Sequence, residues 1–256
     1  MNIFVAILIA IIEGITEFLP ISSTGHMTLA YAILKVPQTE FTKSYEIIIQ
    51  IGAIFAIVYL YWKRIWTDKN LVKKVLLAFI PSAIISFVLY KFVKEVLISN
   101  PLVVIVSLIV GGVILIAFEK FRPKVNIEIE HEAPITTPHA VLIGLCQVLA
   151  LIPGVSRSAS TIIGALLLKE SKKNAIEFSF LLAIPTMFAA TGYDLYKTKA
   201  QFSLEEYLLL VMGVVIAFIS ALLSIKFFLK YVENHSFTVF GIYRIVIAVI
   251  AYLIIF

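Results

Sequence analysis

Two short polar segments interrupt apolar stretches of this chain, and their residue types suit chemistry on phosphate. The first segment reads EGITEFLPISSTGH (residues 13–26) and the second reads PGVSRSAST (residues 153–161). A charged side chain at membrane depth costs ~2.5–3.5 kcal/mol on insertion scales, so such residues usually face a partner or a substrate. We therefore expect the chemistry of this protein to reside in these two segments.

The acids of the first segment form a pair at helical spacing. Glu13 and Glu17 are four residues apart, which places them on one face of a helix. Such a pair suits a divalent cation, with Glu13 and Glu17 as metal ligands, or an acid and a base with separated pKa values. An ordinary exposed acid pair is the alternative, but the preceding residues 4–12 are almost all apolar.

The rest of the first segment predicts a phosphate-binding helix start. Pro20 ends the first helix, and the residues after it are of the types that cap and open a second one: Ser22, Ser23, Thr24 and Gly25. A helix N-terminus with free N–H groups and hydroxyls binds phosphate. Capping alone is compatible with this role.

His26 is the one histidine inside an apolar segment, because His131, His139 and His235 lie in or beside predicted loops. A lone histidine is more often structural than catalytic, but here carboxylates and hydroxyls accompany it. His26 could deprotonate Ser23, attack phosphorus itself or protonate a leaving oxygen.

The second segment predicts a clamp for phosphate. Arg157 offers a planar fork of N–H donors, the preferred group for bidentate phosphate recognition. The alternative is a membrane arginine paired with Glu13 or Glu17, which would still place Arg157 in the site. Supporting roles fall to the glycine of the turn, to two hydroxyls and to an amide that precedes Pro153: Gly154, Ser156, Ser158 and Gln147.

These parts together match phosphoryl transfer, which needs neutralised phosphate charge, a positioned nucleophile and often a metal. The nucleotide motifs GxxxxGK[ST] and GxGxxG do not occur in the sequence. The expected substrate is a phosphorylated lipid whose tail stays in the membrane.

The elements that position these residues are membrane helices. Of the 256 residues, 61% are hydrophobic and 14% charged, and the mean hydropathy is +1.03, which indicates an integral membrane protein. One cysteine, Cys146, excludes an internal disulfide, and the net charge of +5 indicates basic cytosolic loops rather than nucleic-acid binding. Six apolar stretches are long enough to span a bilayer: 45–62, 75–92, 102–118, 175–193, 207–228 and 237–256.

Two further apolar regions, 3–34 and 138–168, are broken midway by Pro, Gly and Ser. We expect each to form a re-entrant helical hairpin. The basic loop 63–74 is cytoplasmic by the positive-inside rule. Counting outward, the first hairpin enters from outside and the second from inside.

The prediction is thus an all-α polytopic membrane protein, a single membrane domain (1–256) with six transmembrane helices and two re-entrant hairpins in an inverted-topology repeat. The first repeat covers 1–124, a polar linker 125–137 and the second, inverted repeat 138–256. Aligning Pro20 with Pro153 places Ser23 over Ser156. Repeats of this kind bring the tips of broken helices together around a ligand.

At these residues the chain resembles the undecaprenyl-diphosphate phosphatase family, the bacitracin-resistance proteins. The family carries (E/Q)xxxE followed by PxSSTGH, and PGxSRSxxT in its second half. This chain has them as Glu13-Gly-Ile-Thr-Glu17, as Pro20-Ile-Ser-Ser-Thr-Gly-His26 and as residues 153–161, with Ala159 where many members have glycine.

The resemblance implies hydrolysis of undecaprenyl diphosphate to the monophosphate at the outer face of a bacterial inner membrane, which recycles the carrier lipid for peptidoglycan synthesis. It implies bacitracin resistance, since bacitracin competes for the lipid, and it implies a Mg²⁺ or Ca²⁺ requirement; a homodimer is one arrangement it permits. The implied catalytic residues are Glu17, Ser23, His26 and Arg157, with Glu13 in support. We favour Ser23 as nucleophile with His26 as its base, and His26 as nucleophile stays open.

Two other functions compete with this prediction. A polyprenyl-phosphate transporter or flippase would share the inverted-repeat architecture. A lipid phosphatase of the phosphatidic-acid-phosphatase type needs a histidine six residues after the arginine, where this chain has Ile163, and a KxxxxxxRP element that the sequence lacks.

Overall fold

The computed structural model describes residues 1–92, 100–121, 134–198 and 202–256, and within them it contains helices and no strand. The helices, in chain order, are α1 (Ile3–Thr16), α2 (Ser23–Ile33), α3 (Glu40–Thr67), α4 (Lys69–Phe92), α5 (Pro101–Phe121), α6 (Thr137–Gln147), the short 3₁₀ helix η3 (Val148–Leu151), α7 (Arg157–Leu167), α8 (Lys172–Thr198), α9 (Leu204–Asn234) and α10 (Thr238–Ile255).

Six helices of the described chain are long and apolar enough to cross a membrane, and they confirm the six predicted spans. They are α3, α4, α5, α8, α9 and α10. All but α10 extend beyond the apolar stretch that marked them, because each continues into polar residues, whereas α10 begins one residue later and ends one residue earlier than its stretch. Ser203, for example, begins α9 in a capping box with Glu206.

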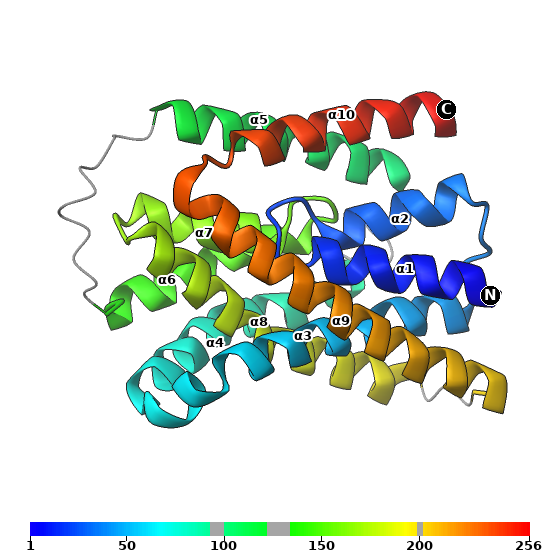
Figure 1. The fold of residues 1–256 in the computed structure, drawn as a ribbon, viewed down its shortest axis with the longest axis horizontal. Coiled ribbons are helices and arrows are strands. Elements are labelled where there is room, and N and C mark those ends of the chain that lie inside the picture. Colours follow the sequence, from blue (N-terminus) through cyan, green and yellow to red (C-terminus); the bar gives the residue numbers. More distant parts are fainter. Residues whose placement is uncertain (93–99, 122–133, 199–201) are drawn as a thin grey trace.

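The two interrupted regions fold as pairs of short helices. α1 packs on α2, and α6 packs on α7. Figure 1 shows that the free ends of the α1/α2 pair and those of the α6/α7 pair lie at opposite ends of the molecule, with the connecting turns near its middle. We call each connecting turn, together with the first turn of the helix that follows it, a tip: the first tip is residues 17–26 and the second tip is residues 152–160.

The two pairs have matching local geometry. Asn2 and Thr136 cap the first helix of each pair. The side chain of each accepts a hydrogen bond from the backbone N–H three residues later in the chain. Ser22 and Ser156 cap the second helix with positive φ angles of 72° and 79°, and Lys35 and Lys169, with φ of 52° and 62°, follow it. The intervals between these residues are equal in both pairs. The structure therefore pairs Ser156 with Ser22, one residue away from the Ser23 that the proline alignment selected.

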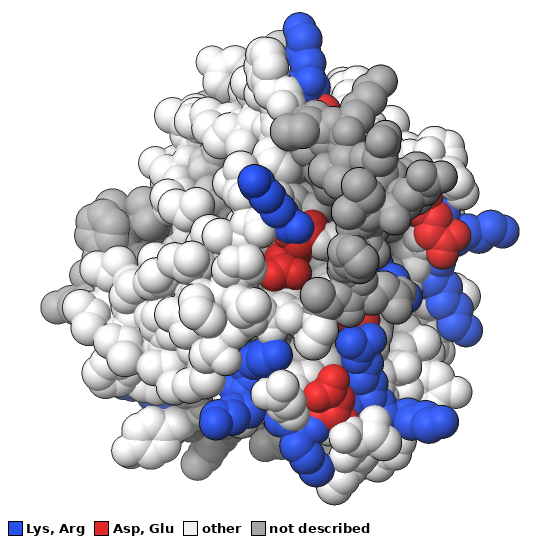
Figure 2. All heavy atoms as spheres, turned by 90° about the vertical axis from the view of Figure 1, so that its left-hand side faces the viewer, with Lys and Arg blue, Asp and Glu red and all other residues white. Residues whose placement is uncertain are grey.

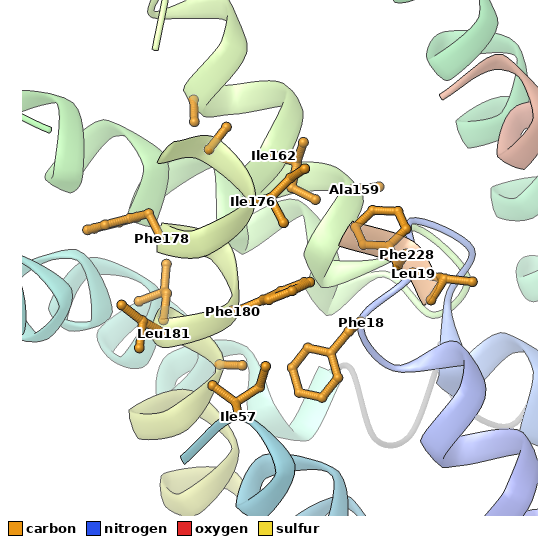
Figure 3. Close-up of a cluster of buried hydrophobic side chains, with 14 of the residues drawn as sticks. Phe18, Leu19, Ile57, Ala159, Ile162, Ile176, Phe178, Phe180, Leu181 and Phe228 are labelled. Carbon is orange, nitrogen blue, oxygen red and sulfur yellow. The ribbon is translucent and has the colours of Figure 1, made fainter. Parts of the chain in front are cut away.

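The surrounding helices enclose the tips. α9 packs on α1 and α3, and α4 packs on α6. α5 lies along α10, and these two helices form one side of the molecule (Figure 1). Phe18 of the first tip anchors the largest apolar cluster, and its ring meets that of Phe180 edge-on at 5.1 Å. Figure 3 shows Phe18 directed into this cluster, toward Phe180 and Ile57.

The predicted linker 125–137 lies mostly outside the described residues, as do Arg122 and Lys124. Its last residues, Thr136 and Thr137, belong to the start of α6.

Candidate active site

Each tip contains a serine held in a backbone conformation that non-glycine residues rarely adopt. Ser22 and Ser156 have positive φ, and their hydroxyls accept hydrogen bonds from the backbone N–H of Gly25 (3.3 Å) and Ala159 (3.2 Å). Such conformations cost of order 1–3 kcal/mol and are concentrated at functional sites. The two caps turn the N-termini of α2 and α7 toward the centre of the molecule.

Glu17 joins the two tips. Its Oε2 accepts a hydrogen bond from the Ser23 hydroxyl, and its Oε1 accepts one from Nη2 of Arg157 at 2.9 Å. All three side chains are buried: Ser23 is 6% exposed, and the side chains of Glu17 and Arg157 are 4% and 9% exposed. The structure thus brings together residues that are 140 positions apart in the chain.

Two further residues, Ser179 and Phe18, fix the guanidinium of Arg157. Nη1 donates to the backbone carbonyl of Ser179 at 2.8 Å, and the guanidinium carbon lies 5.5 Å from the centre of the Phe18 ring. Its Nε is buried and has no hydrogen-bond partner among the described residues. The ion pair that the sequence left open, between Arg157 and an acid of the first segment, is therefore present with Glu17, and the Nε–H remains for a ligand.

Ser158 ties the tips together directly. Its hydroxyl donates to the Leu19 carbonyl at 2.7 Å and lies 3.2 Å from the Ser156 hydroxyl. Gly154 has φ of +93°, and a Cβ there would come within 2.7 Å of the Val104 carbonyl oxygen, so only glycine fits this turn. Near it, Gly25 is close enough that an added Cβ would lie 3.5 Å from the Gly154 Cα. Thr24 lies partly exposed in the first turn of α2.

His26 is oriented differently from the sequence expectation. Its Nδ1 hydrogen-bonds to the Ser22 carbonyl at 2.7 Å, and its Nε2 to the Tyr243 hydroxyl at 2.9 Å. The ring therefore turns toward α10, and the Ser23 hydroxyl is bonded to Glu17 instead of His26. The carbonyl four residues earlier in the helix sets this orientation, a competition that residue types alone do not reveal.

Glu13 is fully buried one helical turn before Glu17, as the spacing predicts. Neither of its carboxylate oxygens meets a hydrogen-bond donor within the described chain. Glu46 of α3 is close enough to act on it electrostatically. An uncompensated buried carboxylate is costly, so Glu13 requires a cation or a proton.

These residues fit a divalent cation that shares its coordination with the substrate. Among the described residues no group of three or more His, Cys, Asp or Glu side chains could hold a metal alone. Mg²⁺ is, however, commonly bound by one or two carboxylates together with substrate phosphates. Glu13 and Glu17 supply this smaller set.

Gln147 lies away from the tips. Its amide nitrogen donates to Ser82 at 2.7 Å and to Thr186 at 3.0 Å, which fastens α6 to α4 and α8. The supporting role expected for it near the phosphate is therefore not the arrangement seen here. Its position before the second tip corresponds to that of Glu13 before the first.

Sequence reasoning missed three polar residues around the site. Glu46 acts on Glu13 electrostatically, Tyr243 hydrogen-bonds to His26, and Arg244 is fully buried and donates to both tips. Glu46 and Arg244 could have been found from the sequence, because each is a charged residue inside a predicted span. Tyr243 carried no such signal, because tyrosine is common in membrane helices.

Comparison with known proteins gives consistent matches over the whole chain. Residues 6–250 match the protein family described as bacitracin resistance protein BacA. A protein of Sulfurihydrogenibium sp. (strain YO3AOP1) is 48% identical over 248 residues, which covers 97% of each chain. One from Aquifex aeolicus (strain VF5) is 50% identical, covering 96% of this chain and 95% of its own, and one from Persephonella marina is 46% identical with 98% coverage of both. Each of the three relatives bears the name undecaprenyl-diphosphatase.

Proposed function

The chain belongs to the bacitracin resistance protein BacA family, and from this premise we propose how its two tips divide the chemistry. Its function is that of a membrane phosphatase, an undecaprenyl-diphosphatase that hydrolyses undecaprenyl diphosphate to undecaprenyl phosphate and inorganic phosphate. This hydrolysis recycles the carrier lipid for cell-wall synthesis and accounts for bacitracin resistance.

The first tip supplies the nucleophile and its base. The Ser23 oxygen attacks the terminal phosphorus while its proton passes to Glu17, whose Oε2 already accepts that hydrogen bond. A phosphorus–oxygen bond forms, the bond to the bridging oxygen breaks, and undecaprenyl phosphate leaves. The single observation that carries this assignment is the buried Ser23–Glu17–Arg157 chain of hydrogen bonds.

His26 acts in the second half of the reaction. Its Nδ1 is occupied by the Ser22 carbonyl, which leaves Nε2 as the basic nitrogen once Tyr243 gives way. Nε2 takes a proton from the water that attacks the phosphoserine, the phosphorus–Ser23 bond breaks, and Glu17 returns the proton to the Ser23 oxygen. Inorganic phosphate is released, and the enzyme regains its starting protonation when His26 passes its proton to solvent. This role replaces the one in which His26 deprotonates Ser23.

The second tip supplies the phosphate clamp. The free Nε–H of Arg157 and the backbone N–H groups at the starts of α2 and α7 are donors for the non-bridging phosphate oxygens. Glu13 and Glu17 would hold Mg²⁺ or Ca²⁺, which when bound neutralises charge on the diphosphate.

We also propose the membrane arrangement that sequence reasoning predicts, with two re-entrant hairpins in an inverted repeat. Three observations support it: the matching caps of the two helix pairs, the opposite directions in which the pairs open, and the pairing of α1 with α9 and of α6 with α4. Figure 2 shows Lys and Arg gathered at the end where α6 begins. This end is cytoplasmic by the positive-inside rule, so the first hairpin opens to the outer face of the bacterial inner membrane.

Phosphate release in detergent tests the proposed chemistry. Purified protein given undecaprenyl diphosphate releases inorganic phosphate, chelator lowers the rate, and Ser23→Ala reduces it to background. Equal release by wild type, Ser23→Ala and His26→Ala would remove these residues from the reaction and favour lipid transport. Bacitracin, which competes for the lipid, should lower the rate in proportion to the substrate it sequesters. The homodimer stays a prediction, and the size of the purified protein in detergent would test it.

A further inference from the structure

Arg244 in the middle of α10 is fully buried, and each of its five N–H groups donates to a backbone carbonyl. The five bonds run from Nε to Leu108 (3.3 Å), from Nη1 to Pro20 (3.3 Å) and Val155 (3.0 Å), and from Nη2 to Ser107 (3.1 Å) and Gly154 (2.8 Å).

The acceptors of Arg244 come from three separate parts of the chain. Pro20 belongs to the first tip, Gly154 and Val155 belong to the second tip, and the remaining two carbonyls belong to α5. One guanidinium on α10 therefore binds both tips and α5 at once. Tip backbones carry carbonyls that no helix satisfies, and an unpaired carbonyl in the membrane interior is costly.

Saturation of its donors separates Arg244 from Arg157. Arg157 keeps an unpartnered buried Nε within the described chain, whereas Arg244 has no N–H left to offer a phosphate. Arg244 therefore acts on the reaction through the backbone of the tips and not by contact with substrate. A lysine has three donors on one nitrogen and cannot reproduce five bonds in a plane.

The packing beside Arg244 leaves room for its guanidinium at a glycine. A Cβ on Gly111 of α5 would overlap Nη2 and lie 2.6 Å from the guanidinium carbon. At the next residue, a Cβ on Gly112 would lie 2.6 Å from the Gly241 carbonyl oxygen. α5 and α10 thus approach closely at the level where Arg244 reaches the tips.

We propose that Arg244 is a positioning residue that holds the two tips in register, so that Glu17 and Ser23 of one meet Arg157 of the other. This inference rests on the proposed function, since it assumes that Arg157 serves the reaction. The expected consequence is that displacing the guanidinium lowers turnover although no group that touches the substrate has changed. Misplacement by about 1 Å is enough to cost on the order of 10²-fold in rate.

Two variants and one matched control test the proposal in full-length protein in detergent. Arg244→Lys removes the fork, and Gly111→Ala pushes it aside while improving local helix propensity. Gly192→Ala makes the same change inside α8, where an added Cβ meets nothing within 4 Å. We expect kcat for undecaprenyl diphosphate to fall at least tenfold in the first two variants and to stay within twofold of wild type in Gly192→Ala. If Arg244→Lys does not fold, Gly111→Ala carries the test.

A double-mutant cycle with Arg157→Lys distinguishes positioning from a loss of folded protein. If the tips are already out of register, Arg157→Lys costs no more than threefold in the Gly111→Ala background, against at least 100-fold in wild type. A smaller folded fraction would leave the cost of Arg157→Lys unchanged. An equal cost of at least 100-fold in both backgrounds, or wild-type turnover in Gly111→Ala, would overturn the proposal.

Failure of the proposed function is visible separately. If Arg157→Lys is fully active in wild type, the phosphate clamp is wrong, and the single variants then decide on Arg244 alone. A tenfold loss in Gly111→Ala that is absent in Gly192→Ala would still support the positioning role. The same turnover in both glycine variants would reject it.

Discussion

Glu17 receives hydrogen bonds from both tips, and this shared carboxylate makes the two polar segments one site. Ser23 donates to one of its oxygens and Arg157 to the other. A carboxylate held in this way is fixed in orientation, and its basicity is directed at Ser23. The sequence identified all three residues, because polar groups inside apolar stretches are conspicuous.

The partners of those residues were harder to predict than the residues themselves. His26 turns toward Tyr243 because the Ser22 carbonyl captures its Nδ1, and Gln147 turns toward α4 and α8. Both outcomes depend on local helix geometry or on distant helices. Residue type and spacing contain no information on either.

Arg157→Lys should lose at least 100-fold in kcat/KM, while the midpoint of thermal unfolding changes by a few degrees at most. Lysine keeps the charge but not the fork that bonds Glu17, Ser179 and the phosphate. Phosphate release and thermal unfolding in detergent measure the two effects. Arg64→Lys is the control, since Arg64 pairs with Glu177 instead. Near-normal turnover of Arg157→Lys would remove it from the clamp.

Glu17→Gln should abolish activity together with metal dependence. An amide can still accept a hydrogen bond from Arg157, but it cannot take the Ser23 proton or bind a divalent cation well. We expect kcat to fall at least 100-fold and the residual rate to be indifferent to chelator. Glu177→Gln, which alters the Arg64 pair, should keep turnover within about twofold. A Glu17→Gln enzyme that remains active and metal-dependent would make Glu17 structural.

At the scale of elements, hydropathy located the spans and polar caps set their ends. Pro20 and Pro153 lie in the turns between the short helices, but α1 already ends at Thr16 and η3 at Leu151, so neither proline is the residue at which a helix ends. The structure adds the positive-φ serines that precede α2 and α7. The crossing points between helices were not predictable, because they depend on which glycines face a neighbour. Gly14, for example, lies against the backbone of α9, where its Cβ would be 2.5 Å from the Ala217 carbonyl oxygen.

Gly52→Ala should destabilise the protein, because its Cβ would overlap the Val214 carbonyl where α3 crosses α9. Overpacking of this kind costs about 1–3 kcal/mol, which corresponds to a lowering of the unfolding midpoint by roughly 2–10 °C. Thermal unfolding in detergent measures the shift. Gly192→Ala should leave the midpoint unchanged or raise it slightly. An unchanged midpoint in Gly52→Ala would contradict the close approach of α3 to the Val214 carbonyl of α9.

At the scale of the whole molecule, the distribution of charge is the basis on which we propose the orientation of the protein in the membrane. The end of α3, the start of α4, the end of α5, the start of α8 and the end of α9 carry basic residues at one end of the molecule (Figures 1 and 2). The sequence predicted this clustering from the alternation of spans. It could not predict that α10 would reach across to hold both tips, because that depends on the way the spans assemble.

Cysteine labelling tests the orientation. In a Cys146→Ser background, Lys35→Cys should react with a membrane-impermeant maleimide in right-side-out vesicles, because Lys35 lies at the end opposite to the basic cluster. Lys69→Cys, at the start of α4, should react after permeabilisation. The reverse pattern would place the opening of the first hairpin in the cytoplasm.

The central claim is that one residue from each tip acts on the same phosphate. The most direct measurement is phosphate release from undecaprenyl diphosphate by Ser23→Ala, by Arg157→Ala and by the double variant. If the residues work as a unit, each single change lowers kcat/KM by about 10³-fold or more. The kcat/KM of the double variant is then within about threefold of that of the less active single variant. Losses that multiply in the double variant, or a single variant with wild-type turnover, would contradict a shared site.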